Sequence, residues 1–239
     1  SHPDGRRALA YILVMPAGDH APHSPRTTVR RGAKRATYDP ADIHGILAYG
    51  IVAHVAVVTD VGPLVLPMVY GIAGDTMYLH GALANSLLRA GGDAEVCATV
   101  TIVDGLVFAK TSFNHSMNYR SVVVRGRARV VTDETEHVAA LRTITEHIVG
   151  TWDTTRPPSA AELRATRVIA LPLDEVSAKV RTGPAVNEAE DADQPFWSGQ
   201  VPIVTVFGAP IDNADASAGV PPRVAGLEGH DVHGDTRGV

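Results

Sequence analysis

The feature that most constrains the fold is a segment of alternating side chains over residues 119–131. Val122 and Val124 would lie on one side of an extended chain, while Val123 and Arg125 would lie on the other. A period of two residues is typical of a β-strand with one buried and one solvent-exposed face. A polar turn precedes this strand, so polar side chains are expected where the strand begins.

Turn sequences divide much of the remaining chain into short segments with the composition of β-strands. Asp104-Gly105 is typical of a tight hairpin and predicts two strands on either side of it. A closed or nearly closed barrel leaves few free strand edges, so we expect a mainly β fold, a β-barrel with a few helices. The expected strands cover residues 51–58, 64–70, 76–80, 94–103, 106–111, 119–131, 167–173 and 176–181.

Four helices are expected from their start and stop signals. Asp39 followed by Pro40 indicates an N-cap and a first helical residue, and Gly50 would end that helix. Asp133 and Ser159 are each followed three residues later by a glutamate, a pattern that predicts two further helix starts. The other three helices are expected at residues 82–90, after Asp133 and after Ser159.

Composition limits the classes of function. With a net charge of −5 and a pI near 6.1, the chain of 239 residues is not expected to bind nucleic acid. The single cysteine, Cys97, excludes an internal disulfide and a cysteine-based zinc site. The sequence contains no run of the ~18 apolar residues that cross a bilayer. The apolar stretch before Met15 is short for a signal peptide and lacks a clear cleavage site, so we expect a cytoplasmic protein without a membrane association.

The chain divides into three parts by composition. Residues 1–35 are rich in proline, histidine and arginine and are predicted to be an N-terminal extension. Residues 36–208 carry the predicted strands and helices and form the expected domain. Residues 209–239 are rich in glycine, proline and aspartate and are predicted to be a tail without its own core.

Common catalytic motifs are absent from the sequence. It contains no dinucleotide-binding glycine motif, phosphate-binding loop, zinc-protease motif or hydrolase nucleophile elbow. The eleven histidines are scattered, so no metal site is expected. His54 interrupts an apolar strand and is interpreted as a core or interface residue rather than a catalyst.

Two clusters of polar residues remain as candidate sites. In the first, Pro67 leaves one position of a strand without a hydrogen-bond donor, and His80, Asn85 and Ser86 follow near a helix start that could hold an anion. An ordinary hairpin followed by a helix is the alternative. The second cluster, residues 110–121, combines lysine, histidine, tyrosine and arginine, and its alternative is a polar barrel rim with a solvated arginine.

These segments together resemble the FMN-binding split-barrel family of pyridoxamine 5′-phosphate oxidase-like proteins, in the branch of flavin-nucleotide-binding proteins of the nitroimidazole-reductase type. The similarity covers roughly residues 36 to 207, and its most specific motif is S-F-N-H-S-M-N-Y-R-S-V-V-V-R-G. The other motifs are I-L-A-Y-G-I-V-A-H-V-A-V-V, L-P-M-V-Y-G, Y-L-H-G-A-L-A-N-S-L-L-R-A and F-W-S-G-Q-V-P.

The resemblance implies a six-stranded split barrel that forms a homodimer, with one FMN in each of two clefts at the dimer interface. It implies that the backbone at residues 67–69 contacts the isoalloxazine ring, and that Trp197 closes the cleft. The phosphate would lie near His80, and Arg120 would contact the phosphate, the ring or the ribityl chain. The implied cofactor-binding residues are Pro67, Met68, Val69, Tyr70, His80, Asn85, Ser86, Lys110, Thr111, Asn118, Tyr119, Arg120, Ser121 and Trp197.

The implied function is that of a flavin-dependent oxidoreductase that passes electrons or hydride to a small organic acceptor. His80 is the candidate proton donor, although a phosphate contact or a structural hydrogen bond is the alternative role. Many relatives carry a cation where this chain has Asn85 and Ser86, which weakens the expected phosphate contact. A non-catalytic protein that binds flavin, a deazaflavin cofactor or haem is therefore the alternative function.

Overall fold

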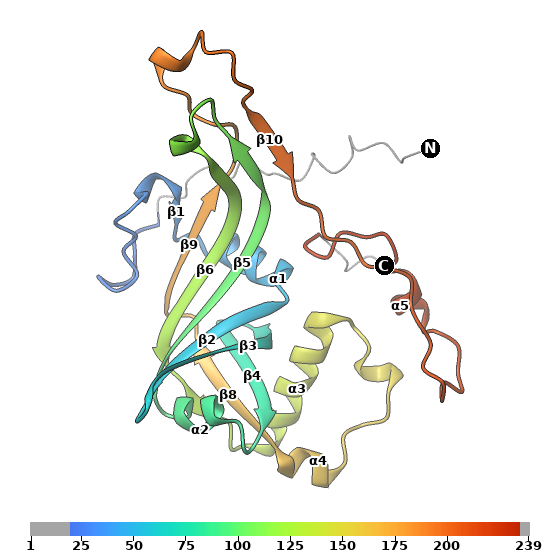
Figure 1. The fold of residues 1–239 in the computed structure, drawn as a ribbon. Helices are drawn as coiled ribbons and strands as arrows, with labels where there is room; N and C mark the ends of the chain where they lie inside the picture. The colour runs from blue at the N-terminus through green and yellow to red at the C-terminus, as the bar shows by residue number, and fades with distance from the viewer. Residues whose placement is uncertain (1–19, 235–239) are drawn as a thin grey trace.

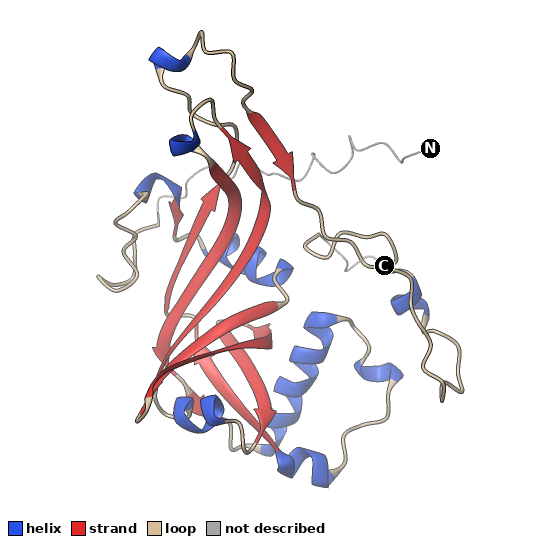
Figure 2. Cartoon of the chain, in the orientation of Figure 1, coloured by secondary structure: helices blue, strands red, loops and turns tan. Residues whose placement is uncertain are grey.

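The structure, a computed structural model, describes residues 20–234. The stretch considered above as a signal peptide, including Met15, lies outside the described residues. Within them, a strongly curved β-sheet dominates, and the helices lie at its ends and along one side (Figure 1 and Figure 2).

The elements alternate between long strands and short helices. The α-helices are α1 (Pro40–Tyr49), α2 (Ser86–Gly91), α3 (Glu134–Ile148), α4 (Ala160–Ala165) and α5 (Pro222–Ala225). The strands are β1 (Ala36–Thr37), β2 (Val52–Thr59), β3 (Gly62–Ala73), β4 (Thr76–Ala82), β5 (Glu95–Phe108), β6 (Ser116–Arg127), β7 (Arg129–Val130), β8 (Thr166–Pro172), β9 (Glu175–Arg181) and β10 (Gly199–Pro202). The 3₁₀ helices are η2 (Ala33–Arg35), η3 (Ser112–Asn114), η4 (Trp152–Thr154) and η5 (Ala189–Asp191).

The ten described strands form one antiparallel sheet in the order β1-β9-β6-β5-β2-β3-β4-β8-β7, with β10 paired to β5. The predicted mainly β fold is therefore confirmed, but the ladder of hydrogen bonds does not close into a ring. The two ends of the strand order are the two-residue strands β1 and β7, which do not pair with each other. The opening between them makes the barrel a split one, and very short edge strands leave few free backbone groups for association.

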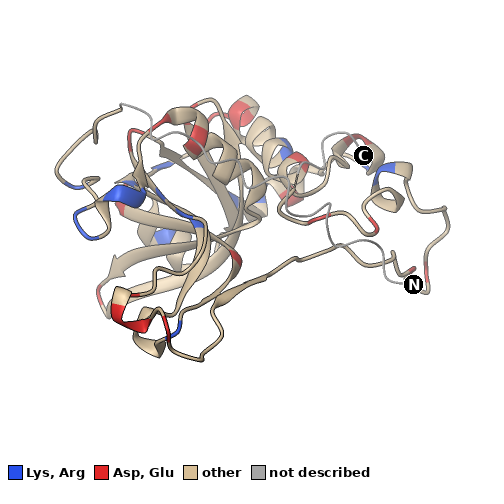
Figure 3. Cartoon of the chain, turned by 90° about the horizontal axis from the view of Figure 1, so that it is seen from above, with Lys and Arg blue, Asp and Glu red and all other residues tan. Residues whose placement is uncertain are grey.

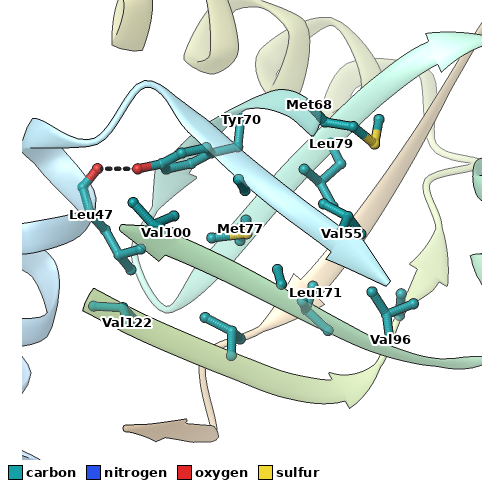
Figure 4. Close-up of a cluster of buried hydrophobic side chains, with 14 of the residues drawn as sticks. Leu47, Val55, Met68, Tyr70, Met77, Leu79, Val96, Val100, Val122 and Leu171 are labelled. Carbon is teal, nitrogen blue, oxygen red and sulfur yellow. Dashed lines mark hydrogen bonds between the residues drawn. The ribbon is translucent and has the colours of Figure 1, made fainter. Parts of the chain in front are cut away.

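The core fills the inside of the curved sheet, where alternate strand residues point inward (Figure 4). Tyr70 is the largest fully buried side chain. Its hydroxyl lies 2.7 Å from the carbonyl oxygen of Leu47 and 2.9 Å from that of Gly50, so it donates to acceptors at the C-terminal end of α1. Carbonyls at a helix end lack partners within the helix, and Tyr70 thus ties α1 to the barrel while satisfying buried polar atoms.

The predicted helix starts are confirmed at three of four positions. Asp39 accepts a hydrogen bond from the backbone N–H of Ala41, and Asp133 accepts one from that of Glu136. The helix from Ser159 begins with a capping box. The prediction of a helix over residues 82–90 is wrong at its start, because α2 begins at residue 86 with an asparagine as its N-cap.

The predicted hairpin at Asp104-Gly105 is also wrong, because β5 runs through both residues as one strand. Its pairing with β6 shifts register between Val103 and Gly105, which marks a β-bulge. The glycine is explained by β10: a Cβ atom at position 105 would lie 2.9 Å from the carbonyl oxygen of Val201. Gly105 therefore lies within a strand and allows β10 to approach closely, and it does not form a turn.

Helix α3 packs on the outer side of β3, β4 and β8 (Figure 1). The approach is closest at Gly71, where a Cβ atom would lie 2.7 Å from the backbone nitrogen of Ile144. Ala140 and Ile144 are the buried residues of the helix. Glycine thus allows the helix backbone to rest directly on the strand, and this contact fixes the position of the C-terminal end of α3.

The chain after β10 returns to α1 and α3 rather than remaining free. Leu227 is buried, Val206 and Asp231 form an isolated bridge, and the imidazole of His233 contacts the carbonyl oxygen of Tyr49 at 2.9 Å. We refer to residues 203–234 as the C-terminal segment. It packs beside the C-terminal ends of α1 and α3, in a region where the sequence predicts a tail without its own core.

Candidate functional site

A neutral patch covers the central part of the outside of β2, β3, β5 and β6, between charged residues such as Arg125 further along the strands. The paired residues His54 and Thr99 lie near its centre, with Pro67 beside His54 and Val123 beside Thr99. We call this surface the outer face; it contains Val52, His54, Ala56, Val65, Pro67, Val69, Thr99, Thr101, Ser121 and Val123, all exposed or half-buried. Lysine, arginine, aspartate and glutamate are absent from this set, and Figure 3 shows long stretches of the strands without charged residues.

Four of the predicted cofactor-binding residues lie on or beside this outer face. Pro67, Val69 and Ser121 belong to it, and Tyr119, two residues before Ser121, lies on the same side of β6 by alternation. Met68 and Tyr70 instead point into the core between them, where both are buried. A ligand on the outer face could therefore contact Met68 and Tyr70 through backbone atoms only.

His80 lies on the outer side of the sheet next to the region that α3 covers. Its strand alternates, so the buried Leu79 points to the core while His80 points away from it, paired in register with Val168. Its Nδ1 atom is buried and has no hydrogen-bond partner among residues 20–234. The side chain of His80 does not face the start of α2, as its place near that helix in the sequence suggested, because Gly81, on the other side of β4, faces it: a Cβ atom there would lie 3.3 Å from Asn85 Nδ2.

Asn85 and Ser86, the predicted phosphate contacts, form the start of α2. The amide oxygen of Asn85 accepts hydrogen bonds from the backbone N–H groups of Leu87 and Leu88 at 3.0 and 3.2 Å. These bonds satisfy the groups that the sequence analysis assigned to an anion. The side chain of Asn85 therefore has a structural role in the chain as it stands.

Lys110, Asn118 and Trp197 hold the arm that carries β10 against the barrel. The ammonium of Lys110 donates to the carbonyl oxygen of Ala192, and the amide of Asn118 donates to Gln200 at 2.8 Å. The indole of Trp197 packs on Phe108 at 5.6 Å between ring centroids. Thr111 caps the short helix η3 nearby. The structure thus brings these predicted residues together, but away from His80.

Arg120 lies on the other side of β6 from Ser121, facing α1. Its guanidinium donates to both carboxylate oxygens of Asp104, with Nη2–Oδ1 at 2.7 Å and Nε–Oδ2 at 3.1 Å. It also lies over the ring of Tyr49, 5.9 Å from the centroid. Arg120 is therefore paired and half-buried beside the C-terminal end of α1, and it is not a solvated charge on the barrel rim.

A groove runs between α1 and α3 on the far side of Tyr49. It has a volume of about 330 Å³ and is lined by His44, Gly45, Ala48, Tyr49, Ile72 and His147. A second cavity of about 150 Å³ shares Ala48, Tyr49 and His147 with it and reaches Arg223 and Leu227 of the C-terminal segment. The sequence analysis missed this groove, because its walls come from three segments far apart in the chain and none carries a recognisable motif.

His147 has defined contacts at the edge of this groove. Its Nε2 atom lies 2.7 Å from the carbonyl oxygen of Gly50, and its ring packs on that of Tyr70 at 4.6 Å. Burial lowers the pKa of His147, partly opposed by the hydrogen bond to Gly50, and burial lowers the pKa of His80 as well. Both imidazoles are therefore neutral at pH 7.

We expect stability to fall as the pH drops below 6.5. Burial lowers the pKa values of His80 and His147 in the folded state, so these histidines take up protons in the unfolded chain at a higher pH than in the folded one. Proton binding therefore stabilises the unfolded state relative to the folded state as the pH falls. The contribution of the two histidines to stability is complete above pH 6.5 and is lost as the pH falls through the folded-state values. Urea unfolding between pH 7 and pH 5 measures this loss, and His80→Gln should remove part of it. A His80→Gln protein with the parental pH dependence would contradict the expectation.

Within residues 20–234, no helix is long and apolar enough to cross a membrane. The same residues contain no group of three or more His, Cys, Asp or Glu side chains placed to hold a metal ion.

Comparison with known proteins identifies two solved structures that are similar over most of the chain. The flavocytochrome Anf3 from Azotobacter vinelandii has 33% sequence identity and a TM-score of 0.82, covering 87% of this chain and 98% of its own. The FAD and haem binding protein from Mycobacterium smegmatis has 31% identity and a TM-score of 0.78, covering 83% of this chain and 98% of its own. A search among curated proteins gives no match.

A third solved structure covers less of the chain. A 5-nitroimidazole antibiotic resistance protein from Bacteroides thetaiotaomicron has 26% identity and a TM-score of 0.52, covering 61% of this chain and 86% of its own. The sequence pattern of the family described as pyridoxamine 5′-phosphate oxidase matches residues 39–180. This region makes up more than half of the chain, which therefore belongs to the pyridoxamine 5′-phosphate oxidase family of flavin-binding split barrels.

Proposed function

We propose that this protein binds a flavin nucleotide together with haem and transfers electrons through them. The observation that carries the proposal is the extent of the match to the flavocytochrome Anf3 and to the FAD and haem binding protein. The family pattern ends at residue 180, and residues 1–180 make up only three quarters of the chain. The two matches cover 87% and 83% of the chain, so each must include residues after position 180. The C-terminal region is therefore shared with relatives described as carrying both cofactors.

The outer face is the proposed flavin site. It offers a neutral surface with the hydroxyls of Thr101 and Ser121 and the ring of Pro67, which suits the uncharged ring system of a flavin. His80, with its unpartnered buried nitrogen, lies at the border of this surface. These groups fit an isoalloxazine, whether it belongs to FAD, as the printed description of the relative suggests, or to FMN, as the sequence analysis predicts.

We also propose that the outer face is completed by a second copy of the chain. Several of its apolar residues are exposed among the described residues, with 40% of Val52 and 55% of Val65 accessible. Large exposed apolar patches rimmed by polar residues mark interaction sites. A homodimer would cover this patch and would enclose a flavin between two protein surfaces, excluding water from its ring. The same proposal includes a cytoplasmic location, where NAD(P)H can supply electrons.

The chemistry assigned to this chain's own residues is modest. Flavin supplies the one- and two-electron chemistry when bound, and the protein supplies position and electrostatics. His80 is neutral near pH 7 and could hold or donate a proton at its Nδ1 atom. The ion pair with Asp104 holds the guanidinium of Arg120 in a fixed position over the ring of Tyr49.

The first test is the absorbance of the purified protein. We expect flavin bands and a haem Soret band, and chromatography of the acid-released flavin distinguishes FAD from FMN. Bleaching by NAD(P)H and recovery with a nitroaromatic acceptor would support an oxidoreductase that acts on small organic acceptors. Bound cofactors that neither reductant nor acceptor affects would support the alternative of a non-catalytic binder. A protein that retains neither flavin nor haem after reconstitution would refute the proposal.

If Arg120 contacts the cofactor, as the sequence analysis expects, Arg120→Ala should lower flavin affinity by roughly tenfold or more. Removing a charge-assisted hydrogen bond costs about 1.5–3 kcal/mol, and ~1.4 kcal/mol is a factor of ten in a dissociation constant. In the structure Arg120 instead pairs with Asp104 on the other side of β6 from the outer face, so this variant decides between a cofactor contact and a structural ion pair. Fluorescence titration with flavin measures the effect, and Arg156→Ala, in an exposed ion pair, is the control. Equal affinities for Arg120→Ala and parent would limit Arg120 to holding Asp104.

A further inference from the structure

Three cations meet at the edge of the sheet where β1 pairs with β9. They are Arg35 at the end of η2 and Lys179 and Arg181 in β9, and we call them the basic cluster. Strand β1 brings the two segments together, because Ala36 is paired in register with Lys179. Figure 3 shows several lysines and arginines on the side of the barrel that carries the N-terminal segment. The chain has a net charge of −5, so this concentration of positive charge does not follow from a basic composition.

Contacts and register place the three side chains close together. The Nζ atom of Lys179 lies over the turn before η2, 3.5 Å from the position of a Cβ atom at Gly32. Burial lowers the pKa of Arg181, and the positive charge of Arg35 lowers it further, so the two guanidiniums are near enough to repel each other. Lys179 and Arg181 are two residues apart in β9 and therefore lie on the same side of the sheet.

No carboxylate in the described part of the chain neutralises these charges. Only 8% of Arg181 is exposed, and its guanidinium donates to the amide oxygen of Asn118 and to the carbonyl oxygens of Gly183 and Pro184, which are all neutral. The ion pairs within residues 20–234 involve other cations and none from the basic cluster. Arginine is seldom buried without an acidic partner, so the cluster has the positive potential of an anion site.

The basic cluster borders the proposed flavin site. Ser121 of the outer face is paired in register with Lys179, and Tyr119 is paired with Arg181. Directly paired residues lie on the same side of a sheet, and neighbouring strands are ~4.8 Å apart. The cations therefore lie one strand beyond the uncharged residues of the outer face. A ligand with a neutral ring system and a phosphate at one end matches this arrangement.

The phosphate contacts expected from the sequence are used within the chain itself. Asn85 satisfies backbone N–H groups at the start of α2, and Arg120 pairs with Asp104. Lys110 donates to a backbone carbonyl oxygen of the arm that carries β10. The basic cluster differs from these groups because its positive charge is not matched by an acceptor of opposite charge in the described residues.

We propose that the basic cluster binds a phosphate group of a nucleotide whose ring system lies on the outer face. Arg35 is exposed and Lys179 is half-buried, so these two contact the phosphate oxygens, while Arg181 adds a fixed positive charge beside them. Guanidinium and ammonium groups are common partners of phosphate in proteins. The inference rests on the proposed function for the position of the flavin, and the phosphate belongs to that flavin or to the nicotinamide nucleotide that reduces it.

The test compares ligands with and without a phosphate. Fluorescence titration of the full-length protein with riboflavin, FMN and FAD should show at least ~tenfold tighter binding of a phosphate-bearing flavin than of riboflavin. This advantage should shrink at high salt, because salt screens the charges. A double variant, Arg35→Gln with Lys179→Met, should lose the advantage and keep the parental affinity for riboflavin. Arg164→Gln is the control, because it removes an exposed charge from α4, away from β1 and β9 (Figure 1).

NADPH and NADH test the other source of the phosphate. If the double variant weakens binding of NADPH but keeps the parental affinities for FMN and FAD, the phosphate belongs to the electron donor. The double variant removes like charges from the neighbourhood of Arg181, so without nucleotide its urea unfolding should match that of the parent. If it does not fold, Arg35→Gln alone decides the question, because this position is exposed in the short helix η2.

The outcomes separate this inference from the function on which it rests. If the parent binds no flavin, the flavin part of the proposed function fails, and the NADPH titration alone decides on the cluster. If the parent binds riboflavin as tightly as FMN and FAD and does not prefer NADPH to NADH, the inference is overturned and the flavin site stands. Parental affinity of the folded double variant for every phosphate-bearing nucleotide would overturn it as well.

Discussion

Gly71→Ala is expected to lower the free energy of unfolding by about 2–3 kcal/mol, the upper part of the range for overpacking a close contact. The new Cβ atom would lie 2.7 Å from the backbone nitrogen of Ile144, 2.8 Å from its Cα and 2.8 Å from the carbonyl carbon of Thr143. All three are backbone atoms of α3, so no side chain can rotate away and the helix itself must move. Urea unfolding of the purified variant measures the change.

The matched control is Gly126→Ala in β6. Its Cβ atom would meet the Cδ1 atom of Leu171 at 3.5 Å, which is an ordinary contact. Alanine in a strand also loses less conformational entropy than glycine on folding, so this variant should be neutral or slightly stabilised. Equal stability of the two variants would show that α3 does not rest on Gly71.

The signals that predicted structure correctly act over short distances. Asp39 and Ser159 cap their helices with hydrogen bonds to residues two or three positions away, so the sequence contains both partners of each contact. The alternation over residues 119–131 likewise predicted the strand that became β6, because the period of two residues is a local property. The curved antiparallel sheet was therefore predictable in its parts.

The errors come from contacts between distant parts of the chain. Gly105 resembles a turn residue, yet it allows β10, almost one hundred residues later, to lie against β5. His80 was placed by its position near the end of a strand, but alternation and the packing of α3 determine which side it faces. The groove was missed for the same reason, because its walls meet only when α3 packs beside α1.

The second large effect concerns the outer face: Thr99→Arg should convert the proposed dimer to a monomer and abolish flavin binding. Thr99 lies between His54 and Val123 near the centre of this neutral surface. In a monomer the new guanidinium would remain in water, so the fold should be retained. In a dimer it would be buried without a partner, and even a cost of ~3 kcal/mol would weaken association by roughly a hundredfold.

Light scattering at micromolar protein concentration measures the mass, and flavin fluorescence measures binding. Val61→Arg is the matched control, because Val61 is 98% exposed in the turn between β2 and β3 and should tolerate the same charge with no change in mass or flavin content. If Thr99→Arg remains a dimer with bound flavin, the association surface must lie elsewhere on the molecule. If it becomes a monomer that still binds flavin with parental affinity, one copy of the chain completes the flavin site, and the outer face serves association alone.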